Sequence, residues 1–364
     1  MVLAKYLGIL LLVGLSVLIA PVQAQQSDYA IITAENIQHL QSVQQIDFEN
    51  LPNGLEAASG LFVTNSDASK IITFGNEPGS PPLSRAILWG YDEEAAVMPI
   101  ADSSIFRALS GDGACLYAGY QGYVEVYQLD QSKGEVIRMA LNEPTDFVND
   151  LWLQDPTTCG NRIYVEVTDE IGQTSVWQLD MNQPDSPVFV YDQLFAIPNQ
   201  DAAARVGRVS PPLALTMDFE GHLYRWDMVD NSLTATVSVG ELAMFGAINQ
   251  AGTHYVWLNE GYNALHVVDF EALADREVVS LGDGFYISHL KLTQEADVII
   301  GVDPKDASGT VSAWLVETGE RIDLGPYRQC NRVQPDLVKL STDVTTLVIG
   351  CDTGLDIWRV VTPQ

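Results

Sequence analysis

The residues in this chain most able to do chemistry are acidic ones, which recur in short polar loops between apolar segments. Carboxylates that converge on one face can bind a divalent cation such as calcium, or a basic protein or peptide. A simpler explanation is that the loops of an acidic protein are themselves acidic. No loop matches the calcium-loop pattern of alternating aspartates, a glycine and a distal glutamate. The candidate binding residues are Glu77, Glu170, Asp218, Glu220, Glu260, Asp303, Asp306 and Asp352.

Local catalytic motifs do not occur in the sequence. There is no Gly-x-Ser-x-Gly, no phosphate-binding Gly-Lys-Ser/Thr loop, no His-Glu-x-x-His and no dinucleotide fingerprint. A site assembled from single residues on several repeats would leave no such motif. We therefore identify no catalytic residue and predict no cofactor, and the metal ligands, if any, stay unassigned. The histidines are spread along the chain at His39, His222, His254, His266 and His289.

The charge balance limits the choice of partners. The 364 residues include 18 Lys and Arg against 48 Asp and Glu, which gives a formal charge of −30. Such a surface repels nucleic acid and anionic lipid, so we exclude both as partners. A charged partner should be cationic, although the charge can also serve solubility alone. We expect a monomer.

The first 24 residues have the pattern of an export signal. Lys5 is followed by an apolar run from Tyr6 to Ala20, and Val22 and Ala24 stand at −3 and −1 of a cleavage site before Gln25. The run of 15 residues is shorter than the roughly 20 needed to span a bilayer. A retained anchor helix is the alternative. We expect cleavage, secretion or periplasmic location, and no membrane span in the mature chain.

The candidate residues lie within a repeat that returns seven times. Each repeat contains short apolar strands, turns, and one strand with a large apolar residue at its centre, and these central residues are 38 to 50 positions apart. Five of the seven are tryptophans, and one Trp per repeat predicts packing between repeats rather than a ligand site. The central residues are Trp89, Tyr127, Trp177, Trp226, Val267, Trp314 and Trp358.

A period near 45 residues with several short strands per repeat is typical of a β-propeller. We predict an all-β fold: one domain over residues 25–364, built from seven blades of four antiparallel strands. In this fold the loops between second and third strands lie on one face, so the acidic candidates should share it. The predicted blades span residues 60–100, 102–141, 147–191, 205–239, 244–281, 286–324 and 333–361.

The last repeat ends one strand early, and the segment 37–48 before the first repeat belongs to no repeat of its own. We predict that this segment closes the ring by completing the last blade, which would also cover an open sheet edge.

Four cysteines in an exported chain suggest disulfide bonds. In the repeat alignment Cys115 opens a second strand next to the first turn that holds Cys159, and Cys330 and Cys351 flank one pair of strands. We predict the bonds Cys115–Cys159 and Cys330–Cys351. A zinc site is the alternative, but there is no Cys-x-x-Cys pair.

The repeats resemble those of the WD-repeat propellers. Trp226-Asp227 is the dipeptide that gives this family its name, and the segment Ile32–Leu40 looks like the lead-in of bacterial secreted propellers of this kind. No repeat has the family's Gly-His pair near its start, so the Asp-His-Ser/Thr-Trp hydrogen-bond network is not expected. The resemblance implies a recognition or scaffold role with no attached reaction.

The function we predict is therefore non-enzymatic recognition of a protein or peptide outside the cytoplasm, through the acidic loops. The alternative is a metal-dependent propeller hydrolase or lyase with its site at the mouth of the central channel. Convergence of three or more carboxylate, Asn or His side chains on one point would favour the enzyme.

Overall fold

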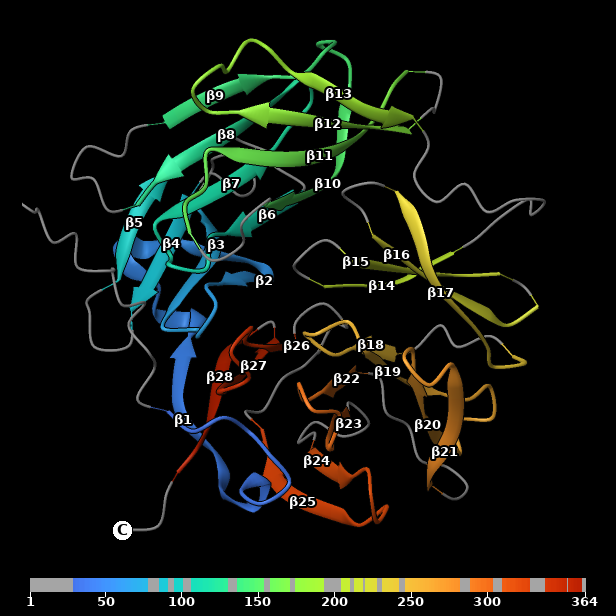
Figure 1. The fold of residues 1–364 in the computed structure, drawn as a ribbon. Coiled ribbons are helices and arrows are strands. Elements are labelled where there is room, and N and C mark those ends of the chain that lie inside the picture. The colour runs from blue at the N-terminus through green and yellow to red at the C-terminus, as the bar shows by residue number, and fades with distance from the viewer. Residues whose placement is uncertain are drawn as a thin grey trace, which may run out of the picture.

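The computed structural model describes residues 29–77, 85–90, 95–100, 106–129, 136–153, 158–170, 174–192, 204–209, 213–218, 220–227, 231–241, 246–281, 289–303, 310–327, 338–351 and 353–361. The described strands form seven antiparallel sheets of four strands, arranged as a ring of blades (Figure 1). The fold is a seven-bladed β-propeller, as the repeat predicts.

Within each of blades 1 to 6 the strands follow one another outward from the centre of the ring. The first, inner strands are β2 (Glu56–Thr64), β6 (Phe106–Leu109), β10 (Phe147–Leu153), β14 (Ala204–Val209), β18 (Gly246–Ile248), β22 (His289–Leu292) and, in blade 7, β26 (Val338–Leu340). The second strands are β3 (Lys70–Asn76), β7 (Cys115–Gly119), β11 (Arg162–Thr168), β15 (Leu213–Met217), β19 (His254–Leu258), β23 (Val298–Asp303) and β27 (Thr346–Cys351).

The predicted aromatic strands are the third strands of the blades. They are β4 (Arg85–Gly90), β8 (Tyr123–Gln128), β12 (Thr174–Asp180), β16 (His222–Asp227), β20 (Ala264–Asp269), β24 (Thr310–Leu315) and β28 (Gly354–Val360). The outer strands of blades 1 to 6 are β5 (Ala96–Pro99), β9 (Val136–Ala140), β13 (Val188–Asp192), β17 (Ser232–Ser238), β21 (Ala274–Ser280) and β25 (Arg321–Pro326).

Blade 7 takes its outer strand from the N-terminal part of the chain. Strand β1 (Leu40–Asp47) pairs antiparallel with β28, from Leu40 opposite Val360 to Asp47 opposite Gly354. Short 3-10 turns flank it: η1 (Ile37–His39), η2 (Phe48–Asn50) and η3 (Pro52–Gly54). The predicted closure of the ring by an N-terminal strand is confirmed.

The segment before β1 is packed into the junction of blades 6 and 7. Ile32, Ile37 and Leu40 are buried in the same apolar cluster as Trp358. Backbone hydrogen bonds hold the segment at both of its ends, from Ile32 N to Val344 O and from Val361 N to His39 O, each 2.9 Å. The lead-in therefore contributes core side chains as well as a strand.

The third-strand tryptophans lie between blades, and two of them each donate a hydrogen bond to a threonine on the neighbouring second strand. The indole of Trp89 donates to Thr73 (2.8 Å), and that of Trp226 to Thr216 (2.9 Å). Each threonine stands two residues beyond the partner directly opposite the tryptophan. In blade 7 the same position holds Ile349, and Nε1 of Trp358 finds no hydrogen-bond partner among the described residues.

The hairpin between first and second strands is built alike in blades 1, 2, 5, 6 and 7. A buried polar residue accepts hydrogen bonds from the amides that begin the second strand, and the residue three positions later has a positive φ. This arrangement pairs backbone amides that the turn would otherwise leave without partners. The polar residues are Asn65, Ser110, Asn249, Thr293 and Ser341, and the positive-φ residues are Ala68, Gly113, Gly252, Ala296 and Val344.

One disulfide joins neighbouring blades. Cys115, at the start of β7, is bonded to Cys159, in the first hairpin of blade 3, with their Cα atoms 5.3 Å apart. The predicted Cys115–Cys159 bond is confirmed. Cys351 is disulfide-bonded too, while its expected partner, Cys330, lies outside the described residues.

Removal of the closing segment should open the ring. Deleting residues 25–48 removes β1 and its flanking core residues, and it exposes the edge of β28. The buried apolar residues lost are Ile32, Ile37, Leu40, Ile46 and Phe48. We expect aggregation or a large fall in melting temperature, measured by light scattering and calorimetry. The milder variant Ile37→Ala should cost about 2–5 kcal/mol of unfolding free energy. A deletion variant that stays monomeric with an unchanged melting temperature would refute this role.

The Trp226–Thr216 hydrogen bond can be tested by a double-mutant cycle. Because Thr216→Val leaves the buried indole N–H without an acceptor, it should lower the unfolding free energy by about 1–3 kcal/mol. In a Trp226→Phe background the same change should cost far less, since no indole donor remains. Chemical denaturation of the four proteins gives the coupling energy. Equal costs in both backgrounds would show that the bond contributes nothing.

Candidate functional site

The loops between second and third strands and those joining successive blades share one side of the ring, which we call the loop face. The opposite side, with the first hairpins, is the hairpin face. Of the eight candidate acidic residues, five are described with their side chains, and Asp303 is described only as the last residue of β23. Asp306 and Asp352 lie outside the described residues. The five are Glu77, Glu170, Asp218, Glu220 and Glu260.

Asp218 is buried, unlike the other four candidates whose side chains are described. It stands between β15 and β16, and its side chain accepts hydrogen bonds from the backbone of Glu220 (2.8 Å) and His222 (2.9 Å) and from the hydroxyl of Tyr224 (2.7 Å). The imidazole Nδ1 of His222 lies 2.9 Å from the same carboxylate. Because these contacts fill its acceptor positions, Asp218 fixes the turn and orients its neighbours.

Glu77 is also engaged, since it forms an ion pair with Arg85 across the loop of blade 1. By contrast, Glu170, Glu220 and Glu260 are exposed on the loops of blades 3, 4 and 5. The side chain of Glu220 is 76% exposed, and one of its oxygens lies 4.0 Å from His222 Nδ1. Three consecutive blades thus present a carboxylate to solvent on the loop face.

A further carboxylate on the loop face was missed by the sequence analysis. Asp146, in the segment joining β9 to β10, is only 5% exposed and accepts a hydrogen bond from the Glu143 amide at 3.2 Å. Burial raises the pKa of Asp146, and the nearby charges of Glu143 and Asp169 raise it further. The polar, proline-containing stretch Asn142–Asp146 predicts a loop at this point of the sequence. No feature of the stretch indicates that its aspartate is buried.

Several carboxylates on the hairpin face are used inside the structure, although others, such as Glu271 and Glu295, are exposed. Asp67, Asp112 and Asp343 each accept hydrogen bonds within their own hairpins. Asp112 also accepts a hydrogen bond from the Cys159 amide of blade 3 (3.0 Å). Asp297, in the first hairpin of blade 6, accepts one from the Ala34 amide of the lead-in (2.8 Å). These hydrogen-bonded side chains connect parts of the ring. They are therefore less available to a ligand than the exposed glutamates of the loop face.

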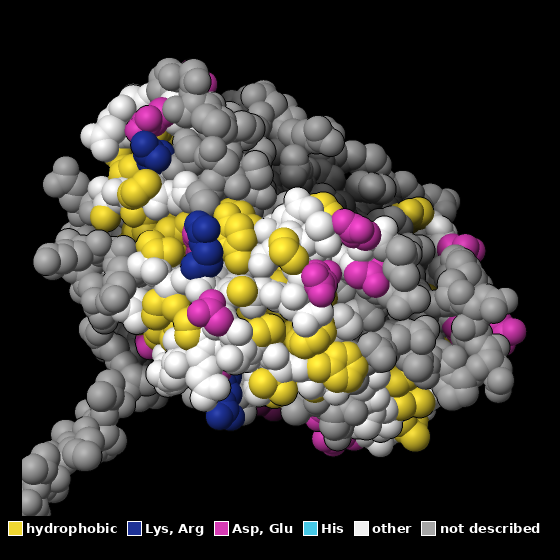
Figure 2. All heavy atoms as spheres, turned by 90° about the horizontal axis from the view of Figure 1, so that it is seen from above, with side chains coloured by type: hydrophobic (Ala, Val, Ile, Leu, Met, Phe, Trp, Pro, Cys, Tyr) yellow, Lys and Arg dark blue, Asp and Glu magenta, His cyan; other side chains and the backbone are white. Residues whose placement is uncertain are grey.

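Two arginines of blade 2, Arg107 and Arg138, stack on aromatic rings. The guanidinium of Arg107 lies 3.7 Å from the ring centre of Phe74, and burial lowers the pKa of Arg107 to about 10. Arg138 lies 4.2 Å from the ring centre of Tyr123 and forms an ion pair with the buried Glu125 at 2.6 Å. On the side of the molecule shown in Figure 2, Lys and Arg side chains are visible only in the left half, whereas acidic ones are spread across it.

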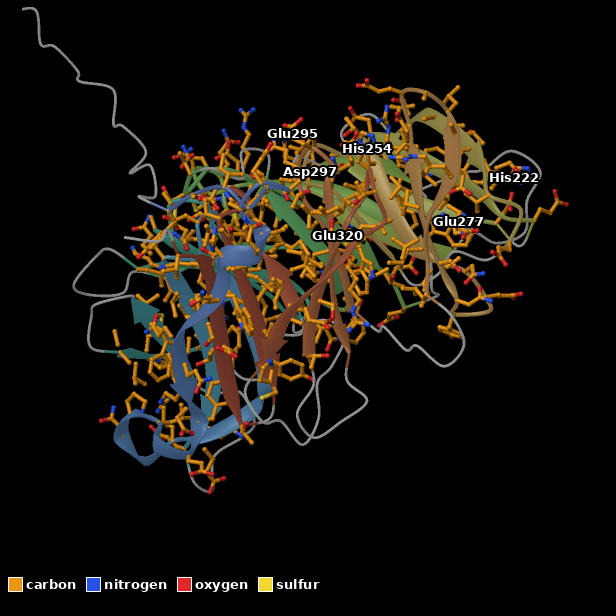
Figure 3. The ribbon with its side chains drawn as sticks, turned by 90° about the horizontal axis from the view of Figure 1, so that it is seen from below. His222, His254, Glu277, Glu295, Asp297 and Glu320 are labelled. Atoms are coloured by element: carbon orange, nitrogen blue, oxygen red, sulfur yellow. A yellow bond between two sulfur atoms is a disulfide. The ribbon has the colours of Figure 1, made fainter. Side chains whose placement is uncertain are left out.

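The histidines with described side chains each lie near a carboxylate in blades 4 and 5, apart from His39. Nε2 of His254 lies 3.6 Å from Asp269, and Nδ1 of His266 lies 3.1 Å from Asp275, which also accepts from the Trp257 indole. In Figure 3, His254 of blade 5 and Glu295 and Asp297 of blade 6 are seen toward the same side of the ring, with His222 apart from them. Across the described ranges, no group of three or more His, Cys, Asp or Glu side chains is arranged to hold a metal ion.

No helix within the described residues is both long and apolar enough to cross a membrane.

Comparisons with known proteins support the fold. No family model matches the chain, and no curated protein sequence matches it either. Among solved structures, a chain in a crystal structure of the mitotic checkpoint complex is similar over 88% of this chain and 96% of its own length. Its TM-score is 0.57 and its sequence identity 13%. At this identity the similarity shows the β-propeller fold alone.

The buried carboxyl of Asp146 should destabilise the folded protein as pH rises. Because its folded-state pKa is raised, stability is highest where Asp146 is protonated and falls as pH passes upward through its titration. Asp146→Asn keeps the acceptor for the Glu143 amide, so it should raise the melting temperature at about pH 7 and lose that advantage near pH 3.

Asp269→Asn is the control with the opposite sign. Backbone hydrogen bonds, first from Ala272 and then from Glu271, lower the pKa of Asp269, so its contribution is present at neutral pH and lost in acid. That variant should be less stable than the wild type at about pH 7 and equal to it in acid. An Asp146→Asn variant no more stable than the wild type at neutral pH would contradict the argument.

Proposed function

We propose that this protein is a non-enzymatic recognition scaffold that binds a cationic protein or peptide on its loop face. The observation that carries the proposal is the exposure of Glu170, Glu220 and Glu260 on the loops of three consecutive blades. The hairpin-face carboxylates Asp67, Asp112 and Asp343 are instead hydrogen-bonded inside their turns. Arrayed carboxylates on a rigid frame favour a positively charged partner and speed its association.

We further propose that the chain acts outside the cytoplasm as a WD-repeat-like propeller of the bacterial secreted type, after cleavage of residues 1–24. The Cys115–Cys159 bond supports this location, since disulfides persist in oxidising compartments. The predicted Cys330–Cys351 bond, the blade limits over 25–364 and the monomeric state belong to the same proposal. The metal-dependent hydrolase or lyase would need ligands that converge on one point, and no contact among the described residues specifically favours it.

A charge-reversal experiment tests the loop face against overall charge. The test protein carries Glu170→Lys, Glu220→Lys and Glu260→Lys. The control carries Glu271→Lys, Glu277→Lys and Glu317→Lys. These exposed glutamates lie on the outer strand β21 or in the turns between third and outer strands, away from the loop face. Both changes alter the net charge equally, so the long-range attraction for a cation falls by the same amount in the two proteins.

Binding of a ten-lysine peptide, measured by calorimetry at low and moderate salt, is the readout. We expect the loop-face variant to bind about tenfold more weakly than the control variant, a difference of ~1.4 kcal/mol. Binding by the wild type should weaken as salt increases. Equal losses in the two variants would mean that net charge, and not the loop face, attracts the peptide.

A further inference from the structure

The outer strands of the seven blades differ in how regularly they pair. The register between the third and outer strands is interrupted in blades 3, 4, 5 and 6, and between β28 and the closing strand β1 in blade 7. Such bulges twist an edge and hinder the addition of another strand. Only β5 and β9, among the described outer strands, pair without interruption.

Of these two regular edges, β9 is the better template for a further strand. β5 has four residues and ends at Pro99, which has no amide hydrogen to donate. β9 has five residues and contains no proline. It lies on the outside of the ring in Figure 1. A strand on this edge would become the fifth strand of blade 2.

One hydrogen bond shows which backbone groups of β9 point outward. The amide of Ala140 donates to the carbonyl of Pro184 in the last turn of blade 3, at 3.0 Å, instead of pairing within blade 2. Outward and inward groups alternate along an antiparallel strand, so the backbone groups of Arg138 and Val136 point outward as well. A segment of blade 3 therefore already occupies the far end of this edge, and Val136 and Arg138 form the part left for another chain.

Exposed apolar side chains lie on β9 and at the start of β13, the outer strand of the next blade. Val136 is 46% exposed, and Val188 and Phe189, which follow Pro184 at the start of β13, are 56% and 47% exposed. Phe189 packs edge-on against Trp177, with ring centres 5.4 Å apart. Exposed large apolar side chains and an open strand edge are both features of surfaces that receive an extended chain.

The charges near the edge indicate the chemistry of that chain. Arg138 is neutralised by its ion pair with the buried Glu125, so it leaves little net charge on the strand. Asp185, in the turn next to Pro184, is exposed, and the whole molecule carries a charge of −30. Two copies of this chain would repel each other across the edge, whereas a segment with basic flanks would be attracted.

We propose that the outer edge of β9 binds an extended, apolar segment of a partner protein with basic residues at its ends. The segment adds as a strand beside Val136 and Arg138, and its apolar side chains contact Val136 and the Val188–Phe189 pair. This surface lies on the rim of blades 2 and 3, so it is separate from the exposed glutamates of the loop face.

The probe for the test is the peptide Lys-Lys-Val-Thr-Val-Thr-Val-Lys-Lys. A matched peptide with N-methyl groups on alternate residues has the same charge and side chains but lacks the amide donors of one edge. On the protein, Val136→Pro removes an outward amide at the first position of β9, where proline is tolerated, and Val136→Thr retains it. Melting temperatures of both variants confirm that the ring is intact.

We expect saturable binding of the probe by calorimetry, and slower hydrogen exchange at the amides of Val136 and Arg138 when it is bound. The N-methylated peptide, and the Val136→Pro protein, should bind about tenfold more weakly, because backbone hydrogen bonds are lost. Val136→Thr should bind almost as the wild type does. The Glu170, Glu220 and Glu260 reversals should leave protection of the Val136 and Arg138 amides in place, which separates this surface from the loop face.

Three results would overturn the proposal. Equal binding of the N-methylated peptide would show that no strand is added. Unchanged hydrogen exchange in β9 with bound probe would place the peptide elsewhere. Dimerisation of the protein without peptide, abolished by Val136→Pro, would make a second copy the occupant. The N-methylated peptide is tested on the wild-type protein, so the conclusion stands even if the proline variant fails to fold.

Discussion

The pairing of β1 with β28 is the interaction on which the rest of the ring depends. Each blade buries its two faces against its neighbours, and an open ring would leave one face of blade 7 and one face of blade 1 in water. The strand and its lead-in bring Ile32, Ile37 and Leu40 into the junction of blades 6 and 7. Because the two partners come from opposite ends of the sequence, this one ladder holds every other blade in the circle.

The two faces of the ring use polar side chains differently. On the hairpin face, buried residues such as Ser110 and Asn249 complete the turns, and Asn249 also reaches Gln294 of the next blade at 2.7 Å. On the loop face, Asp218 serves its own turn, but Glu220 beside it extends into water. Rigid turns therefore hold the exposed carboxylates in place, and ordering of these loops costs little when a partner binds.

Sequence periodicity was sufficient to predict the propeller architecture. A blade can bury its tryptophan-bearing strand only against neighbouring blades of the same kind, so the burial itself requires a repeat. It placed the third strands around Trp89, Trp226 and Trp358 and the N-terminal strand in blade 7. It also brought Cys115 next to Cys159.

The candidate site was less predictable, because residue type does not reveal burial. Asp218 and Glu220 are two residues apart and equally acidic, yet one is buried and the other exposed. Asp146 lies between blades, where its burial depends on how blades 2 and 3 pack. The edge of β9 is regular because its pairing with β8 has no bulge. Bulges depend on the register between two strands, and the pattern of residues along one strand does not specify that register.

The register of the closing ladder also sets how the ring responds to force. The first residue of β1, Leu40, is opposite Val360, near the end of the chain, and the antiparallel pairs run from there toward Asp47 and Gly354. A force that pulls the segments before β1 and after β28 apart would therefore load the hydrogen bonds of this ladder one pair at a time. It would not load them all together in shear. The ladder that closes the ring would thus open pair by pair under such a pull.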